Sequence, residues 1–172
     1  MAGAPTRVLA LDLGAATGWA RFANGQLVGH GVRRLPAGHR HPGEPFHAFG
    51  IWLKQQIAEF SPEVIAFEEP FHNTYRRGHA ASRSLLGYRA LLLALAFAAE
   101  RRVWPVEPHR IKLATCGWLT RKNENGIREH AKARHVLEAV RARHPAVQHE
   151  DEAIAITVGT IAVAEAMQTV QP

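Results

Sequence analysis

The chain has 172 residues, of which 47% are hydrophobic and 21% are charged, so it is long enough for one globular domain with a sizeable core. Its net charge of +6 favours a polyanionic partner such as nucleic acid or an acidic membrane surface, although a basic cytosolic protein without such a partner would have the same composition. A single cysteine, Cys116, excludes an intrachain disulfide and a cysteine-based zinc site, and no apolar stretch reaches the roughly 20 residues of a membrane span. We therefore expect one cytoplasmic domain over residues 1–172, without a membrane segment.

The beginning of the chain predicts a three-stranded antiparallel meander. Its first strand is an apolar run that carries one carboxylate, Asp12, near its end, which is the pattern of a buried strand. Asn24 and Gly25 tolerate the positive φ angles of a tight hairpin turn and therefore separate the second strand from the third. The three expected strands are residues 7–13, 17–23 and 26–35.

The rest of the chain alternates helical and extended patterns. Short apolar runs at residues 64–67 and 103–106 predict two further strands, parallel to the first and joined by helical crossovers. The expected helices are residues 46–60, 82–102, 109–118, 129–142 and 149–167, and the expected loops are residues 36–45 and 119–126. A meander followed by alternating helices and strands and then by closing helices predicts an α/β protein with the RNase H-like fold, a five-stranded mixed sheet flanked by helices.

Carboxylates end two of the buried strands and open the last helix. Asp12 lies in the first strand, Glu68 follows the fourth, and residues 149–152 read His-Glu-Asp-Glu. In the predicted fold these three segments meet, and a carboxylate at a buried strand end is costly unless it is paired or holds a cation. Converging carboxylates repel one another, and their oxygen atoms select Mg²⁺ or Mn²⁺. The pattern predicts a site for two such ions, about 4 Å apart, that would clamp a phosphodiester.

Each of these acidic segments also has a simpler interpretation. Asp12 could belong to a turn, and Glu68 or Glu69 could merely solvate a strand end. A period of two from Ala66 puts Glu68 on the face of Ala66 and Glu69 on the opposite face. The acids of residues 149–152 could complement the helix dipole. The three segments in this order favour the metal-site interpretation over these alternatives.

Three segments resemble the motifs of RuvC-type Holliday junction resolvases. Residues 9–20 (LALDLGAATGWA) are similar to the first motif, residues 64–71 (VIAFEEPF) to the second, and residues 149–157 (HEDEAIAIT) to the last. The resemblance covers nearly the whole chain and implies the RNase H-like fold and a structure-selective endonuclease. Such an enzyme hydrolyses phosphodiesters of branched DNA with two Mg²⁺ or Mn²⁺ ions. The loop-rich middle of the chain is similar to the compact bacteriophage members.

The resemblance also implies roles for the acidic residues. Asp12 and Glu68 match family ligands, and Glu152 matches the acidic residue before the apolar end of the last motif. His149 then occupies the place of a carboxylate three residues earlier, where it would act as a metal ligand or a general base. The alternative register uses Asp151 as the ligand.

Several aromatic and basic residues are expected to contact DNA. Phe71 matches an aromatic that touches a nucleobase in the family, although a core phenylalanine is the alternative, and Lys112 matches a functional lysine. The place of a second family lysine is taken by Asn123, with Lys122 one residue before it. The other residues would hold phosphates, with a solvated surface charge as the alternative for each one. The expected DNA contacts are Phe71, Tyr75, Arg76, Arg77, Arg83, Lys112, Arg121 and Lys122, with Arg128 and Lys132 nearby.

Other functions and assemblies remain open. Residues 85–99 are apolar on nearly all sides, which is explained by a homodimer contact, fitting a symmetric resolvase, or by a deeply buried core helix. A YqgF-like RNA-processing nuclease shares the first strand and its Asp, and a non-catalytic nucleic-acid-binding module is suggested by His149. An actin-like or sugar-kinase ATPase needs two such domains and is excluded by length, so we expect no nucleotide cofactor.

Overall fold

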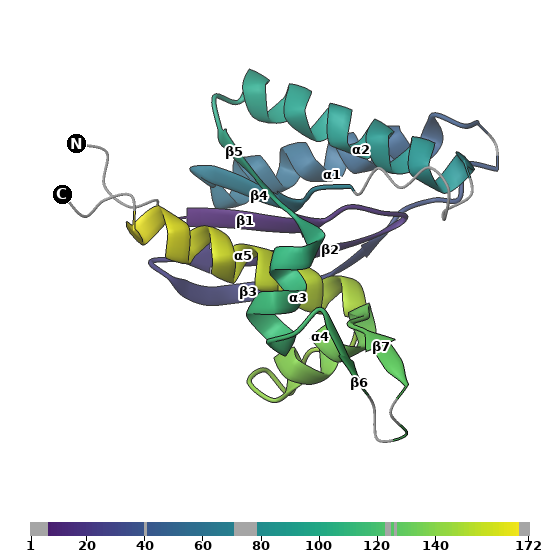
Figure 1. Ribbon diagram of the computed structural model, residues 1–172. Helices are drawn as coiled ribbons and strands as arrows, with labels where there is room; N and C mark the ends of the chain where they lie inside the picture. The colour runs from purple at the N-terminus through teal and green to yellow at the C-terminus, as the bar shows by residue number, and fades with distance from the viewer. Residues whose placement is uncertain (1–6, 40, 71–78, 123–124, 126, 169–172) are drawn as a thin grey trace.

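A five-stranded sheet forms the centre of the molecule in a computed structural model that describes residues 7–39, 41–70, 79–122, 125 and 127–168 (Figure 1). The sheet order is β3-β2-β1-β4-β5, with β1 antiparallel to β2 and parallel to β4, and β4 parallel to β5. This arrangement confirms the predicted meander and the predicted parallel pairing of the first, fourth and fifth strands. The strands are β1 (Arg7–Asp12), β2 (Ala16–Ala23), β3 (Gln26–Arg34), β4 (Val64–Glu68) and β5 (Arg102–Val106).

Helices cover both faces of the sheet. In Figure 1, α1 (Glu44–Phe60) and α2 (His79–Ala98) lie on one face, and α5 (Glu150–Gln168) lies on the other. Two further helices, α3 (Pro108–Cys116) and α4 (Ala133–Arg141), pack against α5. Because β1 and β4 are buried on both faces, their sequences are continuous apolar runs and do not alternate.

Successive side chains of β1 and β4 alternate between two hydrophobic cores, one on each face of the sheet. Leu9, Leu11, Ile65 and Phe67 pack under α1 and α2. Val8, Ala10, Val64 and Ala66 belong to the core under α5. Asp12 and Glu68 continue the second of these alternating sets, so the period of two places both on the face of the sheet that α5 covers.

Two glycines allow α5 to lie directly on the sheet. A Cβ atom at Gly18 of β2 would collide with the backbone of Asp151 and Glu152, and one at Gly159 of α5 would collide with the ring of Phe22. Backbone and ring therefore meet at van der Waals distance only because these positions lack a side chain. The close approach brings the first turn of α5 beside β2, next to the end of β1.

The main departure from the predicted elements is a two-stranded hairpin in the second half of the chain. Strands β6 (Thr120–Lys122) and β7 (Arg128–His130) occupy residues that were expected to be a loop and the start of a helix, and α4 begins later, at Ala133. Each strand has three residues, and polar residues dominate both, so no apolar alternation announces them. The observed order between β5 and α5 is α3-β6-β7-α4.

Helix α2 is a surface helix. Tyr88, Leu92 and Ala96 are buried against the sheet side, whereas Leu86 and Phe97 are 40% and 86% exposed. This pattern rules out the deeply buried core helix that was one explanation of its apolar sequence. Among the helices of the described residues, none combines the length and apolarity required to cross a bilayer.

Candidate active site at the ends of β1 and β4

Asp12 and Glu68 end two neighbouring parallel strands. The paired register of β1 and β4 runs from Val8 opposite Val64 to Leu11 opposite Phe67, and Asp12 and Glu68 are the next residue on each strand. Adjacent strands are about 4.8 Å apart, so the two residues are neighbours across the sheet as well as on the same face. Both side chains are half-buried. The predicted meeting of these two strand ends is thus present in the fold.

The first turn of α5 lies beside this pair. Asp12 is paired in register with Gly18 of β2, and Gly18 in turn touches the backbone of Asp151. Burial raises the pKa of Asp151, and the negative charge of Glu150 raises it further, while His149 and Arg34 oppose the shift. The acidic turn of α5 therefore approaches the edge of the sheet where β1 and β4 end.

Glu152 is held by three hydrogen-bond donors, one of which lies on β3. Its Oε1 atom lies 2.6 Å from Nδ1 of His30 on β3, and its Oε2 atom accepts from the backbone N–H groups of Gln148 and His149 at 3.0 and 3.4 Å. Burial alone raises the pKa of Glu152, but the bonds from His30 and the backbone outweigh it and lower the pKa below its usual value. Glu152 thus acts as a cap of the helix in which it lies.

The described residues contain no group of three or more His, Cys, Asp or Glu side chains that could hold a metal ion. Of the predicted ligands, Asp12 and Glu68 lie at neighbouring strand ends, and Glu152 binds His30 of β3. The donor chemistry still fits Mg²⁺ or Mn²⁺, because Asp12 and Glu68 present hard oxygen atoms on one face.

Glu69 lies on the opposite face from Glu68, as the period of two predicts. Its Oε1 atom accepts a hydrogen bond of 2.7 Å from Nε of Arg89 on α2. The guanidinium of Arg89 also lies over the ring of Phe67, in the core under α1 and α2. Glu69 therefore ties α2 to the sheet.

Half of the residues expected to contact DNA can be located. Arg83 is exposed on α2, and Lys112 is half-buried on α3. Arg121 and Lys122 are exposed on β6. Phe71, Tyr75, Arg76 and Arg77 lie outside the described residues.

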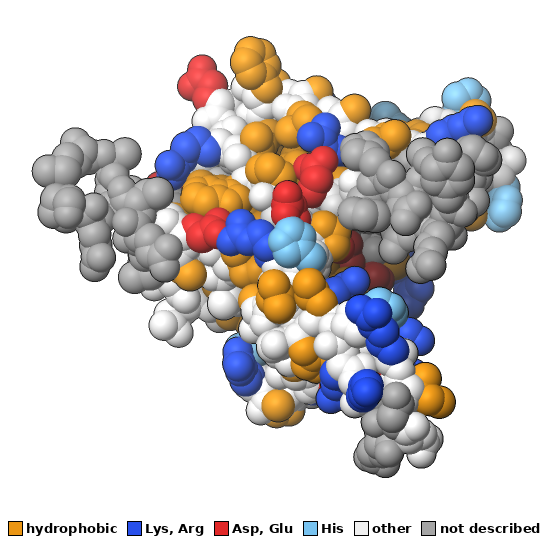
Figure 2. All heavy atoms as spheres, in the orientation of Figure 1, with side chains coloured by type: hydrophobic (Ala, Val, Ile, Leu, Met, Phe, Trp, Pro, Cys, Tyr) orange, Lys and Arg blue, Asp and Glu red, His pale blue; other side chains and the backbone are white. Residues whose placement is uncertain are grey.

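Basic side chains of the β6–β7 hairpin and of α4 surround Glu129. The guanidinium of Arg121 stacks 4.2 Å from the ring of Trp118, and Glu129 on β7 pairs with Arg121, Arg134 and His135. Burial favours the neutral form of Glu129, but these cations outweigh it, Arg134 first, and lower its pKa. Figure 2 shows Lys and Arg side chains gathered over the lower part of the molecule, where the hairpin and α4 lie.

Two residues of the site region escaped the sequence interpretation. His30, which binds Glu152, and Arg34, whose charge acts on Asp151, both belong to β3. Nothing in the local sequence links either residue to the last helix. A recognisable signal is the pattern Gly29-His30-Gly31, since both glycines make room for the ring of Trp19 on the other face of β3.

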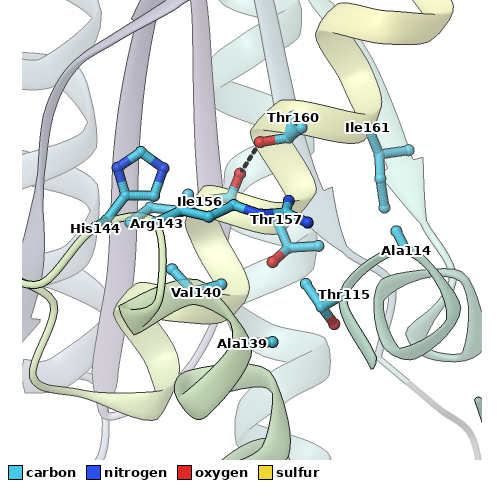
Figure 3. Close-up of a pocket in the computed structure, with 10 residues that line it drawn as sticks. All are labelled: Ala114, Thr115, Ala139, Val140, Arg143, His144, Ile156, Thr157, Thr160 and Ile161. Atoms are coloured by element: carbon cyan, nitrogen blue, oxygen red, sulfur yellow. Dashed lines mark hydrogen bonds between the residues drawn. The ribbon is translucent and has the colours of Figure 1, made fainter. Parts of the chain in front are cut away.

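A shallow pocket between α3, α4 and α5 is separate from this site. Its hydroxyl groups are satisfied within their own helices, because Thr115, Thr157 and Thr160 donate to carbonyl oxygen atoms one turn earlier. Figure 3 shows the lining side chains, among which Arg143 and His144 follow the end of α4. None of the predicted site residues lines it.

The sheet and its helices have the RNase H-like fold of Holliday junction resolvases, which confirms the fold predicted from the sequence. RuvC of Thermus thermophilus, solved in complex with a Holliday junction substrate, matches with a TM-score of 0.70 and 20% identity over 96% of this chain and 99% of that chain. The yeast mitochondrial Holliday junction resolvase matches with a TM-score of 0.61 and 12% identity over 98% of this chain and 83% of that one.

A viral enzyme has the same fold. The fowlpox virus resolvase, solved with its substrate Holliday junction DNA, matches with a TM-score of 0.54 and 9% identity over 92% of this chain and 99% of that chain. No protein-family model and no curated protein sequence matches the chain. The likeness is therefore one of fold.

Proposed function

We propose that the chain is a divalent-metal-dependent endonuclease that cleaves four-way junctions and related branched DNA. The observation that carries the proposal is the neighbouring pair Asp12 and Glu68, on the α5 face at the ends of two parallel strands. Structures of this fold have been solved bound to Holliday junction DNA, which supports a branched substrate.

Asp12 and Glu68 would hold Mg²⁺ or Mn²⁺ together with a group from the first turn of α5. The candidates on α5 and at its cap are His149, Glu152 and, as the alternative, Asp151. Two bound ions would activate the attacking water and stabilise the leaving oxygen. The substrate phosphate would complete the coordination, because Mg²⁺ is seldom held by protein ligands alone.

The β6–β7 hairpin would hold the DNA backbone. Arg121, Lys122, Arg128 and Lys132 are all exposed in this region, and phosphate contacts position a duplex without reading its sequence. The guanidinium of Arg121 stacks on the ring of Trp118 in a cation–π contact. The net charge of +6 supports the same partner.

A homodimer would place two such sites on one junction, and symmetric incision requires two. Exposed apolar side chains on α1 and α2, namely Ile51, Leu86 and Phe97, support this assembly. Light scattering should give twice the chain mass for the wild type and a smaller mass for Phe97→Ser. A monomeric wild type would contradict the dimer and would leave the nuclease proposal standing.

The decisive assay incubates the protein with a synthetic four-way junction, a matched linear duplex and a structured RNA, with and without Mg²⁺ or Mn²⁺. We expect metal-dependent cleavage of the junction alone. Asp12→Asn and Glu68→Gln should abolish cleavage and preserve junction binding. Cleavage by both variants at the wild-type rate would refute the proposal, and preferential cleavage of RNA would favour a YqgF-like RNA-processing nuclease.

A second candidate is a nucleic-acid-binding module of the same fold without catalysis. It is favoured by the engagement of Glu152 with His30 and the backbone, and by His149 in the place of a carboxylate. Calorimetric titration with Mn²⁺ separates the two functions. Binding that is lost in Asp12→Asn supports the nuclease, and no binding by the wild type supports the module.

A further inference from the structure

A histidine on the edge strand of the sheet is bound to the first turn of α5. His30 Nδ1 and Glu152 Oε1 are 2.6 Å apart, although the two residues are 122 positions apart in the sequence. The side chain of Glu152 is 8% exposed and that of His30 is 24% exposed. An ionised carboxylate can only accept, so Nδ1 is the donor of this short bond.

The orientation of His30 is imposed by the strand. His30 is paired in register with Ala20, whose side chain lies in the core under α5, so the histidine also faces α5. On the opposite face, the ring of Trp19 lies across Gly29 and Gly31 and would meet any larger side chain there. The strand therefore presents the histidine to the helix.

The other oxygen of the same carboxylate fixes the backbone before the helix. Glu152 Oε2 accepts from the N–H groups of Gln148 and His149, and the carbonyl of His149 accepts the first helical bond from Ala153. One carboxylate thus joins β3, the residues preceding α5 and its first turn. Removing the histidine would leave a buried acceptor without its partner.

We infer that His30 is a positioning residue that acts through Glu152 to set where the acidic first turn of α5 lies relative to Asp12 and Glu68. The inference deepens the proposed function and rests on it. Partners that orient metal ligands typically contribute 10- to 100-fold to affinity or activity. In this role His30 acts on the position of the helix and not on the substrate itself.

The test compares two substitutions of the histidine. His30→Phe keeps a ring and removes the donor, whereas His30→Asn keeps an amide nitrogen at the same number of bonds from Cα as Nδ1. Mn²⁺ affinity is measured by calorimetry, and cleavage by single-turnover rate at saturating junction. We expect His30→Phe to weaken Mn²⁺ binding and slow cleavage by about tenfold or more with junction affinity unchanged, and His30→Asn to restore most of both.

A matched control is the exposed pair of His109 and Glu107, which are 3.2 Å apart. His109→Phe should leave every readout at the wild-type value. A His30→Phe protein that only melts at a lower temperature, with Mn²⁺ affinity and cleavage rate intact, would overturn the inference. His30→Ala replaces the phenylalanine variant if that protein does not fold.

Amide exchange separates this inference from the proposed function. The Gln148 and His149 amides should exchange faster in His30→Phe, while amides of α1 keep wild-type protection. Unchanged exchange at both amides refutes the positioning role whether or not the wild type binds Mn²⁺. Faster exchange in a protein that neither binds Mn²⁺ nor cleaves junctions would refute the nuclease and retain the structural link.

Discussion

Gly18 is the position where the packing of α5 on the sheet is most easily tested. A Cβ atom there would meet the carbonyl oxygen and carbon of Asp151 and the amide nitrogen of Glu152. All three are backbone atoms, so no side chain can rotate to make room. Gly18→Ala must therefore move the first turn of α5 away from β2, and with it the bond between Glu152 and His30.

The expected cost of this substitution is at the upper end of the range for overpacking, about 3 kcal/mol. For a chain of this length that corresponds to a melting temperature lower by about 6–12 °C, measured by circular dichroism. Gly50→Ala is the matched control, because its Cβ would lie 3.4 Å from a mobile methyl group of Leu91 and the position is inside α1. The control should be neutral or more stable by up to about 1 kcal/mol. A Gly18→Ala protein that melts within a degree of the wild type would refute the close-packing argument.

Three further predictions concern charge. Mn²⁺ at 100 times its Kd should stabilise the wild type by about 2.7 kcal/mol in thermal unfolding, and a similar gain in Asp12→Asn would contradict its role as a ligand. The folded-state pKa of Glu129 is lowered, so the stabilising effect of its carboxylate is complete above about pH 4.3 and is lost as the pH falls through the folded-state pKa. The difference in melting temperature between the wild type and Glu129→Gln should therefore shrink in acid, and a constant difference would disprove this. Arg121→Ala and Lys122→Ala should each weaken junction binding and reduce the slope of log affinity against log salt by about 1. The control Lys54→Ala on α1 should change neither quantity. Equal slopes in all three variants would exclude a contact between the hairpin and phosphate.

The strand ends were predictable because their signals are local. The apolar runs before Asp12 and Glu68 are continuous, and Asn24-Gly25 encodes its own turn, with observed φ angles of 50° and 78°. The alternation of side chains along β4 was enough to place Glu68 and Glu69 on opposite faces of the sheet, and the hydrogen bond of Glu69 with Arg89 confirms this.

Other elements have weak local signals. The strands of the β6–β7 hairpin contain Arg, Lys and His where a sheet normally shows apolar alternation, and the contacts around them involve Trp118 and the basic partners of Glu129. Helix α1 begins at Glu44, earlier than expected, because Pro45 fits the first turn of a helix as well as a loop. Both departures arise where one residue type suits two conformations.

The sequence by itself determined the order of the elements, the sheet that they form and the identity of the acidic residues at the ends of two strands. Periodicity and turn chemistry act over a few residues, so one chain is enough to interpret them. Only the tertiary structure showed the partner of Glu152, since its carboxylate binds His30, a residue far away in the sequence. A hydrogen bond between distant segments leaves no periodic trace in either segment, because it follows from the packing of α5 across the sheet.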